Sequence, residues 1–384
     1  MIHIKTYILA FFIFFFTNCA DEANKNDSLF QIHPGKKTLE IPGINSNNLH
    51  HIQKIKEADN SEYLVLFNEH SGRLFMASWL DGKIMDEVQF YSDGPNGLGN
   101  LYKTGFLFHN RDSIYFYSAF GYTLSLADIN GKVKTRYKIA SKEIETNNAY
   151  PDVRTTKPIF KVGPNIYLNC LKLGIEFIED HTQLGNVIII NESNGEVEYS
   201  AQVKRDSIYN NGLWGLKRQY ELYSCYNPKT GLFTYSFGLD HYLHITDHKS
   251  VLKKIKVRSR FIPEELFPAS EEKVFSPRKV SKEHLQEFDY SNPAYYAIYY
   301  DEYRDVYYRF MRLGWSKEER YDHRPQRYAV SVIDKDFNLI GEEELPNTGY
   351  QFTNMFVDEK GLWIQESDIR NEDRASFSLF SLKM

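Results

Sequence analysis

The sequence lacks the features by which several protein classes are recognised. Three of its 384 residues are cysteines, and beyond the N-terminus no apolar run approaches the ~20 residues that a membrane-spanning helix needs. The net charge is −5, from 46 basic and 51 acidic residues that mix along the chain. We therefore expect neither a later transmembrane helix nor the basic footprint of a nucleic-acid-binding protein.

Motifs of the common catalytic classes are missing as well. There is no Gly-x-Ser-x-Gly elbow, no HExxH and no zinc-spaced pair, and the carboxylates are too scattered to select an acid/base pair. The glycine-rich stretch Asp93–Asn100 lacks the Lys-Ser/Thr and the helix of a phosphate loop, so we interpret it as a turn between blades of the fold predicted below. In Asp240–His248, a strand would point His241 and His244 to opposite faces, so they could not share a metal ion. No catalytic residue, metal or cofactor is predicted.

The N-terminus predicts export. Lys5 precedes an unbroken apolar run from Tyr7 to Phe16, about half a membrane span, which is typical of a signal peptide. The next residues resemble a bacterial lipoprotein box ending at Cys19, although Asn18 replaces the usual small residue. We predict a signal peptide over 1–18, lipidation of Cys19 and a polar tether over 19–29, with an ordinary signal peptide as the alternative. The lipid would anchor the protein in the outer membrane, facing the periplasm or the cell surface.

The remaining cysteines, Cys170 and Cys225, allow one disulfide. An oxidising compartment outside the cytoplasm permits such a bridge. The alternative, which we favour, is a pair of buried free thiols.

An alternating strand, an Asp/Asn-rich turn and a second strand recur along the chain. Pairs such as Asp81-Gly82 and Asn130-Gly131 tolerate the positive φ of tight hairpins, and a further β-rich run precedes each unit. Repetition of this four-stranded module predicts a β-propeller, with a sandwich of hairpins as the alternative. The five repeats cover residues 74–90, 124–139, 187–203, 243–257 and 330–345.

The two ends of the chain together supply a sixth unit. The C-terminal segment from Phe377 would lie beside the N-terminal segment from Phe30, which closes the ring and removes open sheet edges. The sequence therefore predicts an all-β fold, a six-bladed propeller made by residues 30–384 as a single domain. A seventh blade would need a module hidden in the interval after Val257.

Between residues 261 and 291 the β pattern lapses. Prolines interrupt this insertion, and Ser281–Phe288 predicts a short capped helix. Insertions in repeat folds often border the binding face. The alternating basic residues over 132–138 and 254–260 are interpreted as solvated outer strands, which resist edge-to-edge pairing.

The densest aromatic segment, Ser291–Trp315, is interpreted mainly as packing between blades, although its tyrosines and arginines could also receive sugars or carboxylates. Its Tyr300–Arg309 motif, with the Gly94–Gly97 turn and the lipoprotein-like start, resembles a Bacteroidetes-type lipoprotein family, a domain of unknown function thought to form six-bladed propellers. The resemblance spans nearly the whole mature chain. It implies the fold and an anchored, extracytoplasmic setting, and no activity.

Three functions follow from this interpretation. The first is a lipid-anchored binding or scaffold protein with its ligand in the central funnel, where loops from all blades converge; its partner would be a glycan, a peptide or an envelope protein, and the chain itself a monomer. Arg154, Tyr296, Arg304 and Arg309 are the candidate ligand-binding residues. The second is a hydrolase or lyase for carbohydrates or lactones, which paired carboxylates or histidines in the funnel would favour. The third is a purely structural envelope component.

Overall fold

The computed structural model describes residues 28–44, 49–118, 122–139, 149–172, 174–180, 187–200, 206–367 and 371–383. The expected signal peptide (1–18), the lipidation site Cys19 and the tether up to residue 27 lie outside the described residues. Within the described part of the chain, no helix is long and apolar enough to cross a membrane.

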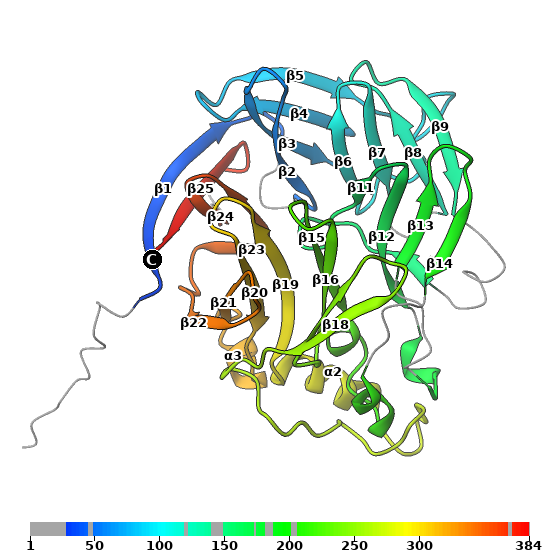
Figure 1. The fold of residues 1–384 in the computed structure, drawn as a ribbon, viewed down its shortest axis with the longest axis vertical. Coiled ribbons are helices and arrows are strands. Elements are labelled where there is room, and N and C mark those ends of the chain that lie inside the picture. The colour runs from blue at the N-terminus through cyan, green and yellow to red at the C-terminus, as the bar shows by residue number, and fades with distance from the viewer. Residues whose placement is uncertain are drawn as a thin grey trace, which may run out of the picture.

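Six antiparallel sheets stand around a common centre (Figure 1), which confirms the six-bladed propeller. Blade I holds β2 (Ile52–Lys56), β3 (Glu62–Asn68), β4 (Arg73–Ser78) and β5 (Ile84–Gln89). Blade II holds β6 (Gly105–Asn110), β7 (Ser113–Tyr117), β8 (Thr123–Ala127) and β9 (Val133–Lys138). Blade III holds β10 (Ala149–Pro151), β11 (Phe160–Val162), β12 (Asn165–Lys172), β13 (Val187–Asn191) and β14 (Val197–Ser200). Blade IV holds β15 (Leu222–Asn227), β16 (Leu232–Phe237), β17 (Tyr242–Thr246) and β18 (Val251–Lys256). Blade V holds β19 (Ala294–Asp301), β20 (Val306–Arg312), β21 (Tyr328–Asp334) and β22 (Leu339–Glu344).

Blade VI closes the ring with strands from both ends of the chain. It contains β23 (Tyr350–Asp358), β24 (Gly361–Glu366), β25 (Arg374–Leu382) and, as its outermost strand, β1 (Phe30–Glu40). In Figure 1 the blue β1 lies beside the red β25, and Phe30 pairs with Leu382 while Glu40 pairs with Arg374. The predicted closure is confirmed, and it satisfies backbone groups that an open last blade would leave unpaired.

Short turns fix the hairpins within the blades. Gly82 and Gly131 both have φ of 78°, the left-handed backbone that their Asp-Gly and Asn-Gly pairs were expected to provide. On the opposite side of the sheets, Asn68 and Asn227 accept hydrogen bonds from backbone N–H groups two residues further on, both at 2.9 Å. These Asx turns give the chain reversals that join adjacent strands.

The insertion between blades IV and V contains one helix and no strand, so the structure rules out a seventh blade in this interval. Helix α2 spans Lys282–Ser291, and the Ser281 side chain accepts a hydrogen bond from the His284 backbone N–H, as the predicted cap requires. A second short helix, α3 (Lys317–Tyr321), connects β20 and β21. Both helices lie at one side of the ring in Figure 1. Short 3-10 helices span Ile175–Phe177, Ser207–Asn211 and Arg218–Tyr220.

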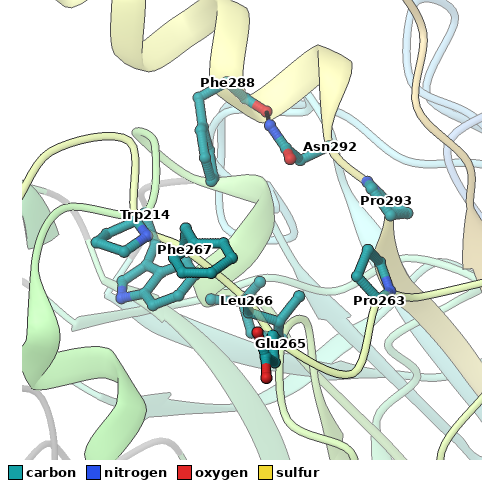
Figure 2. Close-up of a pocket in the computed structure, with 10 residues that line it drawn as sticks. Trp214, Pro263, Glu265, Leu266, Phe267, Phe288, Asn292 and Pro293 are labelled. Atoms are coloured by element: carbon teal, nitrogen blue, oxygen red, sulfur yellow. Dashed lines mark hydrogen bonds between the residues drawn. The ribbon is translucent and has the colours of Figure 1, made fainter.

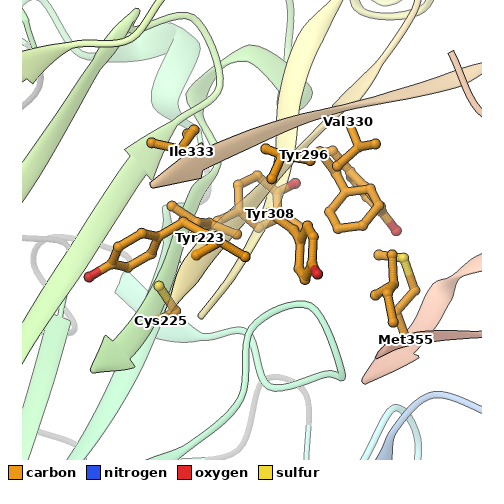
Figure 3. Close-up of a cluster of buried hydrophobic side chains, with 14 of the residues drawn as sticks. Tyr223, Cys225, Tyr296, Tyr308, Val330, Ile333 and Met355 are labelled. Carbon is orange, nitrogen blue, oxygen red and sulfur yellow. The ribbon is translucent and has the colours of Figure 1, made fainter. Parts of the chain in front are cut away.

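The apolar core lies between neighbouring blades. Figure 3 shows one cluster, in which Tyr223 and Cys225 of blade IV pack with Tyr296 and Tyr308 of blade V, and Met355 of blade VI lies at the right of the view. The packing role expected of the aromatic segment is confirmed for Tyr296 and Tyr308. Full burial of one large apolar side chain contributes about 1.5–3 kcal/mol, so such clusters hold the blades together.

Cys170 in β12 and Cys225 in β15 are both buried and free. The disulfide alternative is therefore not what the structure shows. Burial raises the pKa of both thiols, which keeps them protonated and inert.

Candidate ligand-binding site

Blade III is interrupted where the other blades are regular. Its innermost position is shared by β10 and β11, which pair with opposite ends of β12, and the residues between them leave the sheet. In this break Asp152–Lys157 form a hairpin, closed by two backbone hydrogen bonds between Arg154 and Lys157 (3.2 and 2.8 Å). We call these residues the plug hairpin.

The contacts of the plug hairpin place it in the centre of the ring. The Ile52 backbone N–H of blade I donates to Thr155 Oγ1 (3.0 Å), and this hydroxyl donates to Asn354 Oδ1 of blade VI (3.0 Å). The Tyr299 hydroxyl of blade V donates to the Thr155 carbonyl (3.4 Å). Because one residue of blade III is bonded to three other blades, the hairpin lies across the central channel.

A glycine in blade II makes room for the hairpin. Gly105 begins β6, and a Cβ atom at this position would lie 2.3 Å from Val153 Cγ1 and 2.4 Å from the Val153 carbonyl oxygen. Both separations are far shorter than a van der Waals contact. The close approach of β6 to the plug hairpin therefore requires glycine.

Two cations and two carboxylates meet at the plug hairpin. Lys157 Nζ lies 2.7 Å from Asp152 Oδ2 and 3.7 Å from Glu221 Oε2. Arg154 Nη2 lies 3.0 Å from Glu221 Oε2 and 3.4 Å from Asp152 Oδ2. Glu221 directly precedes β15, so this network joins blade III to blade IV. None of the four side chains is more than 20% exposed.

The network keeps both carboxylates ionised. Burial alone would raise the pKa of Asp152, but Arg154 and Lys157 outweigh it and hold that pKa below its usual value. Burial acts on Glu221 in the same way, and Lys157, Arg154 and Arg312 together hold its pKa well below the usual range. The Tyr223 hydroxyl also donates to Glu221. Neither carboxyl has the raised pKa that a general acid needs at neutral pH.

A pocket of about 230 Å³ opens beside this network. Its wall comes from blades I, II, III, IV and VI, at the end of the ring where the innermost strands begin, which we call the mouth. The charged or polar lining residues are His50, Lys103, Asp152, Arg154, Lys217 and Thr353, and the others are Leu49, Tyr150, Pro151 and Leu171.

His50 is held as a neutral ring at the edge of the pocket. Its Nε2 lies 2.9 Å from the Val153 carbonyl oxygen, which can only accept a hydrogen bond, so Nε2 carries the proton. Burial lowers the pKa of His50 to about 4. At neutral pH its Nδ1 is therefore a hydrogen-bond acceptor.

Of the four candidate residues predicted from the sequence, one lines this pocket and a second is buried beside the charge network. Arg154 is part of the plug hairpin and lines the pocket. Tyr296 in β19 is buried nearby, where Arg154 and Arg312 are among the charges that act on its pKa and the Arg312 guanidinium lies 4.8 Å from its ring centre. Burial raises the pKa of Tyr296, so its hydroxyl stays protonated.

The other two candidates lie in contacts between blades. Arg309 is fully buried and donates to Ser236 Oγ (2.8 Å) and to the Asp240 carbonyl (2.6 Å) of blade IV. Arg304 follows β19 and donates to Asp301 Oδ2 (2.9 Å) and to the Glu359 carbonyl (2.7 Å) of blade VI. The structure therefore separates both arginines from the pocket, and their donors are already engaged by the protein.

Sequence reasoning missed most of the charged groups of the site. Asp152, Lys157, Lys217 and Glu221 were not selected, although the run Asp-Val-Arg-Thr-Thr-Lys at 152–157 breaks the β pattern of blade III. This interruption of the β pattern was the one feature of the sequence that could have indicated the hairpin. The partner Glu221 carries no local signal, because its place beside the hairpin depends on the closure of the ring.

The histidines of Asp240–His248 have separate partners. His241 Nδ1 lies 3.0 Å from Tyr295 Oη, His244 Nε2 lies 2.9 Å from Asp240 Oδ2, and His248 Nε2 lies 3.0 Å from Tyr235 Oη. Among the residues that the structure describes, no group of three His, Cys, Asp or Glu side chains could hold a metal ion.

A second pocket, of about 240 Å³, lies between the insertion and Trp214 (Figure 2). Trp214, Leu266, Phe267 and Phe288 give it an apolar wall, with Glu265 as its one charged lining residue. The Trp214 indole N–H donates to the Ile208 carbonyl (3.1 Å) and is not available to a ligand. With fewer convergent polar groups than the central pocket, it is the weaker candidate for a specific site.

Comparisons with known proteins agree with this fold. The family model described as "Domain of unknown function (DUF4221)" matches residues 27–344. A crystal structure of a DUF4221 protein from Bacteroides vulgatus is 21% identical, has a TM-score of 0.73, and the alignment covers 92% of this chain and 98% of that one. A protein of Bacteroides fragilis assigned as exported is 10% identical, has a TM-score of 0.52, and the alignment covers 93% and 96% of the two chains. No curated protein matches the sequence.

Proposed function

The chain belongs to the family described as a domain of unknown function (DUF4221), and from that premise we propose that it is a lipid-anchored, extracytoplasmic binding protein whose ligand occupies the central pocket. The observation that carries the proposal is the convergence of polar side chains from several blades on one pocket beside the plug hairpin. Pockets with a few convergent polar groups are the usual form of small-molecule sites.

The construction of the site supports binding more than catalysis. Asp152 and Glu221 are the carboxylates at the pocket, and cations hold the pKa of both below its usual range. Acid/base catalysis by two carboxyl groups needs one of them with a raised pKa, because that group must carry a proton at neutral pH. The hydrolase or lyase alternative would therefore have to use groups other than these two.

The setting outside the cytoplasm is supported by the N-terminal sequence. The apolar run before Cys19 and the lipoprotein-like box predict export and lipidation, and the similar Bacteroides fragilis protein is assigned as exported. At the end of the predicted tether, Ser28 Oγ and the Leu29 backbone N–H both donate to the Glu343 carboxylate of blade V (2.6 and 2.7 Å). A lipid on Cys19 would thus be joined to the body by a short polar segment.

A ligand screen with one blocked variant tests the proposed pocket. Thr353 lines the mouth and lies within the register shift of β23, so Thr353→Trp fills the pocket without breaking a ladder pair. We expect some members of a panel of sugars, sugar acids, sugar phosphates, amino acids and dipeptides to raise the Tm of the wild type by several degrees and to have no effect on Thr353→Trp. Thr135→Trp, on the exposed outer strand β9, should respond as the wild type does. Equal responses of Thr353→Trp and wild type, or no response to the whole panel, would refute the proposal.

The proposed lipid anchor and membrane location are tested separately in cells. We expect metabolic labelling with a palmitate analogue to mark the wild type and not Cys19→Ala, and the labelled protein to fractionate with the outer membrane. Protease treatment of intact cells then distinguishes the cell surface from the periplasm. Recovery of unlabelled wild-type protein in the soluble fraction would contradict the lipid anchor.

A further inference from the structure

We infer that the central pocket binds a small molecule that carries an oxyanion, a carboxylate or a phosphate ester, with Arg154, Lys217 and Lys103 as the groups that receive it. The inference rests on the proposed function of the pocket and adds the chemical class of its ligand. It is drawn from the balance of charge, from the unused hydrogen-bond donors and from the size of the pocket.

The described residues at the pocket carry an excess of positive charge. Lys103, Lys217 and Arg154 line it, with Lys157 and Arg312 behind them, and these five cations face the two carboxylates Asp152 and Glu221. Arg154, Lys157 and Arg312 are largely buried against the two carboxylates, which leaves one positive charge in excess there, and the exposed Lys103 and Lys217 add two more. This excess stands in a chain whose overall net charge is −5. Burying a charge without a counter-charge is costly, so a bound anion would stabilise this cluster.

Several donors of these cations are unused. Among the described residues, Arg154 Nε and Arg312 Nε and Nη2 are buried and have no hydrogen-bond acceptor. Arg312 Nη2 lies 3.9 Å from Glu221 Oε2 and Lys217 Nζ lies 3.8 Å from Glu221 Oε1, and both separations exceed a hydrogen bond. Buried polar groups are nearly always paired in folded proteins, so these unpaired N–H groups show that the cluster has fewer acceptors than donors. Arginine is the residue that binds carboxylate and phosphate groups in two-point contacts.

Lys103 and Lys217 both lie at the mouth. Lys103 has φ of 49°, a backbone conformation that lysine rarely adopts, and it lies in the turn Leu101–Thr104 that leads into β6. Lys217 precedes β15, and its side chain is 48% exposed. Both lysines line the pocket together with Arg154, so both ammonium groups can reach an anion bound in it.

The volume limits the ligand. About 230 Å³ is below the ~300–1,000 Å³ that is typical for drug-sized molecules, so the pocket fits one sugar-sized acid or the acidic end of a longer chain. Leu49, Pro151 and Leu171 provide an apolar wall for the body of the molecule. The neutral His50 ring offers Nδ1 as an acceptor for a hydroxyl group. A hydroxylated acid therefore matches the lining better than a bare inorganic ion.

Matched pairs of probes test the inference. D-glucuronate and D-glucose 6-phosphate are compared with neutral D-glucose by isothermal titration calorimetry, with inorganic phosphate as a fourth probe. We expect at least one of the two sugar anions to bind, D-glucose to bind at least tenfold more weakly, and the affinity for the anion to fall between 50 and 500 mM NaCl. The two sugar anions distinguish a carboxylate ligand from a phosphate ester.

Two lysine variants identify the receiving group without uncovering the buried network. Lys217→Met should weaken anion binding about tenfold, because a hydrogen bond to a charged group has roughly this effect. Lys229→Met is the matched control, since Lys229 is 49% exposed, lies 3.7 Å from a carboxylate oxygen of Asp305, and stands in the turn between β15 and β16, at the opposite end of β15 from Lys217. It should leave binding unchanged.

The failure of this inference can be told apart from failure of the proposed function. If D-glucose binds as well as its anionic counterparts and Thr353→Trp abolishes that binding, the pocket is a binding site and the anionic class is wrong. If no anionic probe binds, or if Lys217→Met and Lys229→Met weaken binding equally, the assignment of the receiving groups is overturned. If Thr353→Trp also leaves every response in the wider panel unchanged, the proposed function fails with it.

Discussion

Replacing Arg309 by methionine tests how two neighbouring blades are joined. The guanidinium of this β20 residue is fully buried and donates to Ser236 Oγ (2.8 Å) and to the carbonyls of Asp240 (2.6 Å) and Val257 (2.9 Å). It also lies 3.2 Å from the ring centre of Tyr295. Methionine keeps an apolar stem of similar length and removes all of these contacts, so the variant measures what the guanidinium contributes.

The expected loss of stability depends on two opposing contributions, the hydrogen bonds that the guanidinium makes and the cost of burying its charge. A hydrogen bond from a charged donor contributes about 1.5–3 kcal/mol, so three short bonds contribute roughly 5–9 kcal/mol. Burial of a guanidinium among neutral acceptors costs several kcal/mol, which methionine avoids, whereas the carbonyls left unpaired add a cost of their own. We expect Arg309→Met to lower the free energy of unfolding by about 3–5 kcal/mol, a large share of the ~5–15 kcal/mol that stabilises a typical domain.

Urea unfolding, followed by tryptophan fluorescence, measures this loss. The same substitution at Arg73 is the control, because that side chain is 45% exposed and pairs with Glu87 at the surface, where an ion pair contributes about 1 kcal/mol or less. If Arg309→Met is no more destabilising than Arg73→Met, the contacts between blades IV and V do not carry the energy assigned to them. A full loss with unchanged anion binding would also show that Arg309 has a structural role and no ligand-binding role.

Three further changes test other parts of the fold. Gly105→Ala should destabilise the protein by about 1–3 kcal/mol in urea unfolding, because its Cβ would collide with the plug hairpin; an unchanged midpoint would mean that the hairpin is not packed as described. Burial lowers the pKa of His50 to about 4 and of His51 to about 3, so below pH 6.5 the unfolded chain binds protons before the folded one. The free energy of unfolding should therefore fall by about 2 kcal/mol per histidine between pH 7 and pH 5. Burial raises the pKa of Asp289 to about 6, so protonation of this carboxyl in the folded state should offset about 1 kcal/mol of that fall. A pH-independent stability between 7 and 5 would contradict this. Removal of residues 28–40 should expose the edge of β25 and cause aggregation in light scattering, whereas a chain that starts at residue 28 should stay monodisperse.

The blades could be predicted because their causes are local. Alternation of apolar and polar residues on both sides of Asp81-Gly82 specifies a hairpin without reference to the rest of the chain, and the structure has it as β4 and β5. Ser281 marks the start of α2 in the same way. The positions of the candidate arginines, in contrast, could not be predicted from the sequence around them. The aromatic segment around Arg309 was expected to pack between blades, but nothing near Arg309 in sequence indicates that its hydrogen-bond partners lie in blade IV rather than in the channel.

The plug hairpin could not be predicted for a related physical reason. A polar run such as Asp152–Lys157 between strands is expected at the surface, since buried backbone groups and charges must be paired. Here the partners exist, but blades I, IV, V and VI supply them, so the hairpin can be buried only after the ring has closed. The same arrangement has a functional consequence. The hairpin lies across the channel and Arg154 lines the pocket at the mouth, so we expect a ligand to approach Arg154 from the mouth, where Lys103 and Lys217 also lie. Arg154 would have both roles, because its ion pair with Glu221 helps to bury the hairpin and its guanidinium would receive the ligand. A substitution that loosens the hairpin should therefore change binding and stability together.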